Sequence, residues 1–192
     1  NKKQNKIDIS HIAVKNKGLI SLFAGSRKSE INVLMPILMD FIKLMNEKYN
    51  DMIYVFHSTK VYSQLMHNFL KEKNLSNCVI VDDDEIKSHI LQKSIFAVAK
   101  SGTVSLEICN ANIPSIILYK MSFINFLIVK NLIKIKYANI INFAADEEII
   151  PELLQSKCNS KSIFENVCNF LDNPHKIKDQ VQKIQVILKP KI

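Results

Sequence analysis

The chain has 192 residues, of which 47% are hydrophobic, and it carries a formal net charge of +8. This length fits one domain or one half of a two-domain enzyme, and the longest apolar stretch, 121–133, is too short and too interrupted by polar residues to span a bilayer. The positive charge suggests an anionic partner, such as a nucleotide, a nucleic acid or a membrane, although scattered surface lysine gives the same total.

Two further observations concern the cellular setting. Four cysteines occur, none of them in a C-x-x-C pair or near a histidine at zinc spacing: Cys78, Cys109, Cys158 and Cys168. They predict reduced thiols in a cytosolic protein without a metal site. The first eighteen residues lack the apolar core of a signal peptide, and the chain does not begin with methionine, so we expect a fragment of a longer protein.

Residues 1–18 are rich in Lys and Asn without periodicity, and they predict a tail or an interdomain linker before one domain at 19–192. There the pattern predicts a strand at 19–24, a helix at 30–48, a strand at 53–56, a helix at 61–70, a strand at 78–81, a helix at 85–91 and a strand at 95–99. Next come a helix that ends at Ala111, a strand at 114–119, an apolar-basic helix at 122–135 and a short strand at 140–141. The last predicted elements are helices that begin at Pro151, Ser160 and Pro174.

The alternation of strands and helices predicts an α/β fold, a Rossmann-like parallel sheet with helices on both faces. Pro36 predicts a kink or a late start in the first helix, and the acidic run 82–84 can cap the third. Parallel sheets of this kind bind ligands at the carboxyl ends of their strands. The residues that directly follow the predicted strands are therefore the first candidates for a site.

Two such turns contain glycine, and one of them holds the only arginine of the chain. They are Gly25-Ser26-Arg27 and Ser101-Gly102-Thr103, which together contain two of the three glycines. Backbone N–H groups in such a turn and at the following helix N-terminus can face an anion, and a guanidinium holds two phosphate oxygens at once. The turns therefore predict phosphate binding, and an ordinary turn with a solvated arginine is the alternative.

Three polar side chains are further candidates. Glu107, one turn into its helix, is placed to accept hydrogen bonds from a pair of ribose hydroxyls, or else it caps or solvates the helix. Asn142 and Gln155 are neutral amides suited to sugar hydroxyls or a phosphate, or are surface or capping residues. The G-x-G-x-x-G, G-x-x-x-x-G-K-[ST] and G-x-S-x-G patterns are missing, which excludes a dinucleotide fingerprint, a P-loop and a nucleophile elbow.

Four motifs occur in an order and spacing that resemble the carboxyl-terminal half of the lipid-A-disaccharide synthase family, glycosyltransferases of the GT-B architecture. They are G-S-R-x-x-E at 25–30, S-G-T-x-x-L-E at 101–107, Tyr119-Lys120 and P-E-L-L-Q at 151–155. The chain departs from the family pattern at Lys120 for arginine, Ile141 for proline, and 144–146, where Ala-Gly-Arg is common.

The resemblance implies the nucleotide-sugar-binding half of an inverting glycosyltransferase, which joins UDP-2,3-diacylglucosamine to 2,3-diacylglucosamine 1-phosphate and releases UDP and the lipid A disaccharide. It implies a UDP site formed by Gly25, Ser26, Arg27, Ser101, Gly102, Thr103, Glu107 and Tyr119. Arg27, Asn142 and Gln155 match positions that the family needs for activity. The resemblance implies neither a metal nor another cofactor, because cationic side chains and helix dipoles stabilise the leaving UDP.

The acceptor site and the general base are expected in an amino-terminal half that this chain does not contain, so we expect the chain alone to bind UDP weakly without turnover. We expect a cytoplasmic protein of a Gram-negative bacterium, peripheral at the inner face of the inner membrane, and no nucleic-acid partner. The basic-apolar segment 122–136 fits an anionic membrane surface, and equally a helix packed on the sheet or on the missing domain.

Three alternatives stay open on the sequence alone. The first is the donor domain of another GT-B UDP-sugar transferase, which richer glycine loops would favour. The second is a non-enzymatic, basic nucleotide- or nucleic-acid-binding α/β module, for which a steep salt dependence of binding would argue. The third is a remnant without activity.

Overall fold

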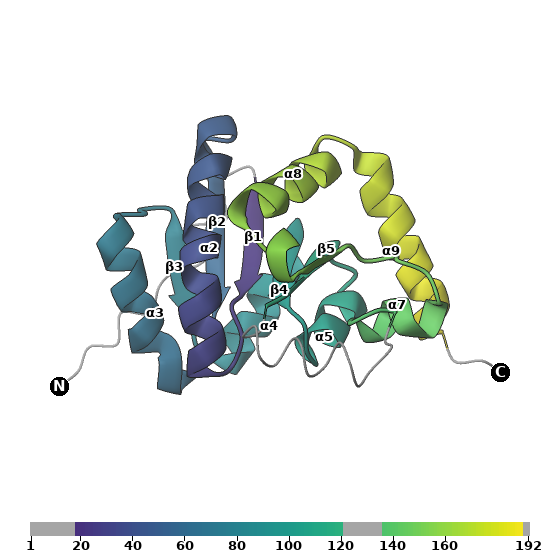
Figure 1. Cartoon of the computed structure of the whole chain (residues 1–192), viewed down its shortest axis with the longest axis horizontal. Helices are drawn as coiled ribbons and strands as arrows, with labels where there is room; N and C mark the ends of the chain where they lie inside the picture. Colours follow the sequence, from purple (N-terminus) through teal and green to yellow (C-terminus); the bar gives the residue numbers. More distant parts are fainter. Residues whose placement is uncertain (1–17, 121–135, 190–192) are drawn as a thin grey trace.

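The computed structural model describes residues 18–120 and 136–189. These residues contain a six-stranded, all-parallel sheet with the strand order β3-β2-β1-β4-β5-β6 (Figure 1). The strands are β1 (Gly18–Phe23), β2 (Met52–His57), β3 (Cys78–Val81), β4 (Phe96–Lys100), β5 (Ser115–Tyr119) and β6 (Glu152–Leu154). The predicted α/β class with a parallel sheet is confirmed.

Helices cover both faces of the sheet. They are α2 (Lys28–Lys48), α3 (Lys60–Lys73), α4 (Asp84–Lys93), α5 (Val104–Asn110), α7 (Ile140–Ala145), α8 (Ser160–Leu171) and α9 (Pro174–Leu188), with a 3-10 turn η1 (Gln155–Lys157). The apolar residues of α2, α3 and α8 pack together on one face, and Figure 1 shows α2 in front of β2 and beside β1. Apolar residues of α4, α5, α7 and α9 cover the other face.

The alternation of side chains along β4 shows how one strand serves both layers. Phe96 and Val98 belong to the core under α2 and α8, whereas Ala97 and Ala99 pack against the opposite layer. All four side chains are fully buried, as expected for a central strand of a parallel sheet. Because β4 pairs with β1 and β5, the turns that follow these strands emerge at one edge of the sheet.

The predicted sixth strand at 140–141 is wrong. Asn139 accepts a hydrogen bond from the Ile141 N–H at 2.8 Å and caps a helix instead, so that Ile141 packs into the core from α7. The sixth strand is β6, at the place where we expected a helix to begin at Pro151. The carbonyl of Pro151 accepts a hydrogen bond from the Ile117 N–H at 2.9 Å, which aligns the chain with β5 instead of starting a helix.

Proline and capping predictions had mixed outcomes. Of the kink or late start predicted at Pro36, the late start is wrong, because α2 begins at Lys28 and continues through the proline. The predicted cap of α4 is confirmed, since the Asp83 carboxylate accepts hydrogen bonds from the N–H groups of Glu85 and Ile86. Helices also begin at Ser160 and Pro174 as expected. The helix predicted at 122–135 lies outside the described residues.

Candidate functional site

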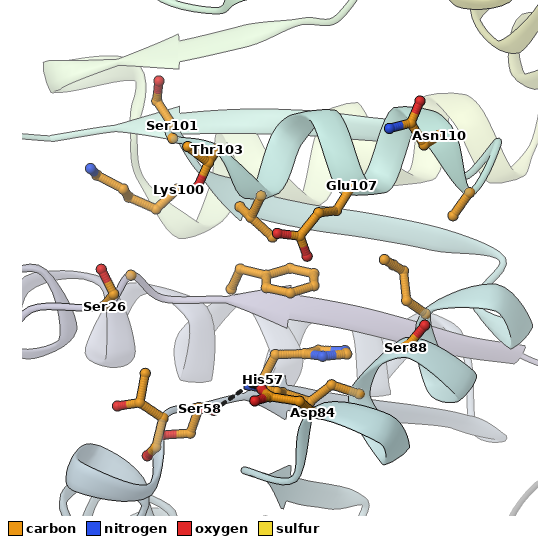
Figure 2. A pocket seen from close by; sticks show the side chains of 18 of the residues that line it. Ser26, His57, Ser58, Asp84, Ser88, Lys100, Ser101, Thr103, Glu107 and Asn110 are labelled. Atoms are coloured by element: carbon orange, nitrogen blue, oxygen red, sulfur yellow. Dashed lines mark hydrogen bonds and ion pairs between the residues drawn. The ribbon is translucent and has the colours of Figure 1, made fainter.

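A cavity of about 720 Å³ opens at the carboxyl ends of β1, β2 and β4, between α4 and α5 (Figure 2). The strand order reverses here, because the chain moves outward from β1 through β2 and β3 and then returns to β4 on the other side of β1. Such a switch point leaves a crevice between the two loops, and α/β sheets bind ligands in this crevice.

Six of the residues predicted from the sequence line this cavity: Gly25, Ser26, Ser101, Gly102, Thr103 and Glu107. The pairing of β1 with β4 places Phe23 opposite Ala99, so that the turns after these two strands lie beside each other. Figure 2 shows Glu107 pointing from α5 into the cavity. Two motifs that lie far apart in the sequence therefore face one space.

The turn after β1 needs glycine for two reasons. Gly25 has φ of +105°, which side chains rarely adopt, and an added Cβ would collide with Glu30 Oε2 and lie 2.7 Å from Glu30 Cβ. Glu30 closes the turn by accepting a hydrogen bond from the Ser26 N–H at 3.0 Å. The first helical bond of α2 runs from the Ile31 N–H to Arg27 O, so the preceding N–H groups of the first turn have no helical carbonyl partner and leave a positive helix end.

Charge at this end of the cavity is shared among three side chains. Glu30 Oε1 lies 2.9 Å from Lys100 Nζ and 3.8 Å from Arg27 Nη1. Burial opposes ionisation of Glu30, but the hydrogen bonds from Lys100 and the Ser26 N–H, with the charges of Lys100 and Arg27, hold the pKa of the carboxyl below its usual range. Arg27 is 80% exposed and lies outside the cavity lining, where its guanidinium is accessible to an anion.

The turn after β4 is more open. An added Cβ at Gly102 would meet no atom within 4 Å, and its φ is not in the left-handed range. Neither the backbone nor the packing of the described residues therefore requires glycine at this position. The open space beside Gly102 belongs to the cavity and is available to a ligand.

His57 forms part of the cavity floor at the end of β2 and is only 6% exposed. Its ring stacks on Phe23 with a centroid distance of 4.2 Å, and its Nε2 lies 2.8 Å from Ser21 Oγ. Burial, assisted by the positive charge of Lys87, lowers the pKa of His57 to about 3. The imidazole is therefore neutral at physiological pH.

We expect the burial of neutral His57 to make the fold acid-sensitive. The unfolded chain binds the proton near pH 6.5 and the folded chain only near pH 3, so this contribution to stability is complete above pH 6.5 and falls as the pH decreases towards 3. The free energy of unfolding should fall by up to about 1.4 kcal/mol per pH unit in this window. Urea denaturation between pH 7 and pH 4 measures this dependence. The free energy of unfolding of His57→Phe should depend less steeply on pH than that of the wild-type chain, whereas His89→Phe, at an exposed position, should keep the wild-type dependence.

Asn142 lies outside the cavity and is fully buried. Its Oδ1 accepts hydrogen bonds from the N–H groups of Ile149 and Ile150 at 2.9 and 2.8 Å, and its Nδ2 donates to Ile150 O at 2.6 Å and Glu152 Oε1 at 2.9 Å. The Glu152 carboxylate also accepts hydrogen bonds from the backbone N–H groups of Ala138 and Asn139. The amide thus has no hydrogen-bonding capacity left for a substrate, which favours a positioning role.

Tyr119 and Gln155 end up at the same edge of the sheet as the cavity but do not line it. Tyr119 is the last residue of β5, and Gln155 directly follows β6, with a left-handed φ of 50° that is uncommon for a side chain other than glycine or asparagine. The cavity is centred on β1 and β4, so the edge strand β6 places Gln155 beyond it.

Sequence reasoning missed His57, Lys87 and Lys100, all of which line the cavity. Two of them carried a positional signal: His57 comes directly after the predicted strand 53–56, and Lys100 directly precedes the S-G-T turn. Lys87 carried none, because it lies within α4 and reaches the site only through tertiary packing, donating to Ser58 O at 3.1 Å.

Within residues 18–120 and 136–189, no group of three or more His, Cys, Asp or Glu side chains is arranged to hold a metal ion. No helix there combines the length and apolar character needed to cross a membrane.

Comparison with known proteins adds a family assignment. The family model described as lipid-A-disaccharide synthetase matches residues 1–191. The lipid-A-disaccharide synthase of Sulfurihydrogenibium sp. is 32% identical over 186 residues, which cover 91% of this chain and 47% of that protein. The chain spans about half the length of the curated relatives it matches.

Solved structures agree on the fold. The C-terminal domain of a glycosyl transferase group 1 family protein from Francisella tularensis superposes with a TM-score of 0.59 at 14% identity, covering 93% of this chain and 88% of that one. The UDP-GlcNAc 2-epimerase from Neisseria meningitidis, bound to UDP-GlcNAc, superposes with a TM-score of 0.58 at 11% identity, covering 89% and 43%.

Proposed function

Because the chain belongs to the lipid-A-disaccharide synthetase family, we propose that it is the half of this glycosyltransferase that holds the UDP-sugar donor. The observation that carries the proposal is that the Gly25 turn, the Gly102 turn and Glu107 face one cavity at the switch point of the sheet. A nucleoside diphosphate needs N–H donors and cations at one end and an acceptor for ribose hydroxyls further in. This cavity offers both.

In this proposal the diphosphate lies against Gly25, Ser26 and the first turn of α2, with Lys100 and Arg27 as its cations, and near Ser101–Thr103. Arg27 then neutralises the charge that develops on the departing UDP, as electrostatic stabilisation of a leaving group requires. Glu107 binds the ribose, and Tyr119 is a further contact to the nucleotide. We propose that these groups act without a metal or another cofactor.

The reaction proposed for the complete enzyme joins UDP-2,3-diacylglucosamine to 2,3-diacylglucosamine 1-phosphate with inversion at the anomeric carbon. The acceptor site and the general base would belong to the amino-terminal half, which acts on the donor held here. Asn142 and Gln155 would act at the β6 end of the site, Asn142 by holding the 147–152 segment in place. Lipid substrates favour peripheral attachment to the inner face of the inner membrane.

We expect the chain to bind UDP. The Arg27→Ala variant should bind UDP about 10- to 100-fold more weakly, because a charge-assisted, bidentate contact is lost. Isothermal titration calorimetry at low salt measures both affinities. Lys161→Ala removes an equally exposed cation on α8 and should leave the affinity unchanged. A folded chain that does not bind millimolar UDP would contradict the proposal, and equal losses in both variants would show that only net charge matters.

A further inference from the structure

A buried chain of hydrogen bonds leads away from the cavity floor into the protein. His57 Nε2 lies 2.8 Å from Ser21 Oγ, and Ser21 Oγ lies 2.7 Å from Ser94 Oγ. Ser94 Oγ in turn donates to the backbone carbonyl of Ile90 at 3.0 Å. All three residues are at most 6% exposed, so these hydrogen bonds are shielded from water.

The directions of these hydrogen bonds follow from the single proton of each hydroxyl. Ser94 gives its proton to Ile90 O, which can only accept, so Ser94 Oγ must accept the proton of Ser21. Ser21 Oγ can then only accept from His57, which places the imidazole proton on Nε2. The structure thereby assigns the tautomer of a neutral histidine, and Nδ1 carries a lone pair.

Nδ1 of His57 has no hydrogen-bonding partner within the described part of the chain, and the ring lines the cavity (Figure 2). Stacking on Phe23 and the bond to Ser21 hold the ring in one orientation. The nearby ammonium of Lys87 contacts Asp84 Oδ1 at 2.6 Å and Ser58 O at 3.1 Å and makes no hydrogen bond to Nδ1 among the described residues. The cavity floor therefore presents a fixed, uncharged hydrogen-bond acceptor.

We propose that His57 Nδ1 accepts the imide N–H of uracil and makes His57 the residue that selects uracil over cytosine, an inference that rests on UDP binding in this cavity. UDP offers three donors, its two ribose hydroxyls and the imide N–H. If Glu107 accepts from the hydroxyls, the imide N–H is the donor that remains for Nδ1. Cytosine has a lone pair at the same ring position, so two acceptors would face each other without a proton.

The test compares UDP with CDP in calorimetric titrations of the chain and of His57→Phe, which keeps a ring on Phe23 and removes the acceptor. We expect the wild-type chain to bind UDP about 10- to 100-fold more tightly than CDP, and His57→Phe to lose this preference through weaker UDP binding. His89→Phe, an exposed position on α4, should keep the preference. An unchanged UDP-to-CDP ratio in His57→Phe would overturn the assignment.

Ser94→Ala provides a second test that leaves His57 in place. Without the Ser94 hydroxyl, Ser21 is free to donate to Nε2, and the imidazole proton can move to Nδ1. Nitrogen-15 spectra of the imidazole should show the proton on Nε2 in the wild-type chain and a mixture of tautomers in Ser94→Ala, with a smaller preference for UDP. A proton on Nδ1 in the wild-type chain would overturn the assignment. A folded chain that binds no UDP would contradict the proposed function itself and remove the basis of this inference.

Discussion

Alanine in place of Asn142 is expected to lower the free energy of unfolding by about 3 kcal/mol, since a buried amide with four hydrogen bonds is removed. The Ile150 N–H would lose its Asn142 acceptor, the Ile149 N–H would keep only Glu147 O, and the buried Glu152 carboxylate would lose one donor. Urea denaturation at neutral pH measures the change. Asn166→Ala serves as a control, because its half-buried amide makes a single hydrogen bond to Ser162 O within α8.

The same variant distinguishes positioning from direct contact. Asn142 lies outside the cavity lining, so Asn142→Ala should keep the UDP affinity of the isolated chain while it lowers kcat of the complete enzyme. An Asn142→Ala chain that is still folded in the titration but has lost UDP binding would show that Asn142 touches the nucleotide, contrary to the geometry.

The two glycines of the candidate site should respond to alanine in opposite ways. Gly25→Ala places a side chain in a left-handed conformation against Glu30 and should cost about 2 kcal/mol or more of stability. Gly102→Ala meets no atom within 4 Å and should change stability by less than about 0.5 kcal/mol. If the diphosphate approaches this turn, the added methyl group should nevertheless weaken UDP binding about 10-fold.

Thermal denaturation and calorimetry on the same two variants test this pair of expectations. Each variant controls for the other, because both add one methyl group to a turn at the carboxyl end of a central strand. A Gly102→Ala chain with wild-type affinity for UDP would place the diphosphate elsewhere in the cavity. A Gly25→Ala chain as stable as the wild-type chain would mean that the turn can relax around Glu30.

Much of the fold follows from local patterns. The long apolar periodicity of α2 and the short β-branched run of β3 each carry enough signal to be assigned from the sequence alone. The region 140–154 does not carry enough local signal to be assigned in this way. Ile140 and Ile141 have strand-like side chains, yet the Asn139 cap makes them helical, and β6 contains a buried glutamate that no strand pattern predicts. That glutamate is tolerated because three N–H groups from elsewhere in the chain converge on it.

The candidate site was likewise only partly predictable from the sequence. Gly25 and Gly102 were recognisable because a turn leaves a composition signal that does not depend on the rest of the fold. The interpretation of Asn142 as a group that contacts substrate could not be checked before the structure, since saturation of its hydrogen bonds depends on Ile149, Ile150 and Glu152 folding back on it. His57 and Lys87 come from β2 and α4, and only the folded chain brings them to the same cavity.

The position of β1 beside β4 has a thermodynamic consequence. The two strands are joined in the sheet but separated in the chain by β2, β3 and three helices, so the two turns above them meet only after this whole segment has folded. A nucleotide that touches both turns has no equivalent site in the unfolded chain, and its binding free energy adds to that of folding. At a hundredfold excess over its dissociation constant, such a ligand would stabilise the domain by about 2.7 kcal/mol. A donor bound as proposed would therefore hold the turns after β1 and β4 together, and local unfolding that separates these two strands would become rarer as the donor concentration rises.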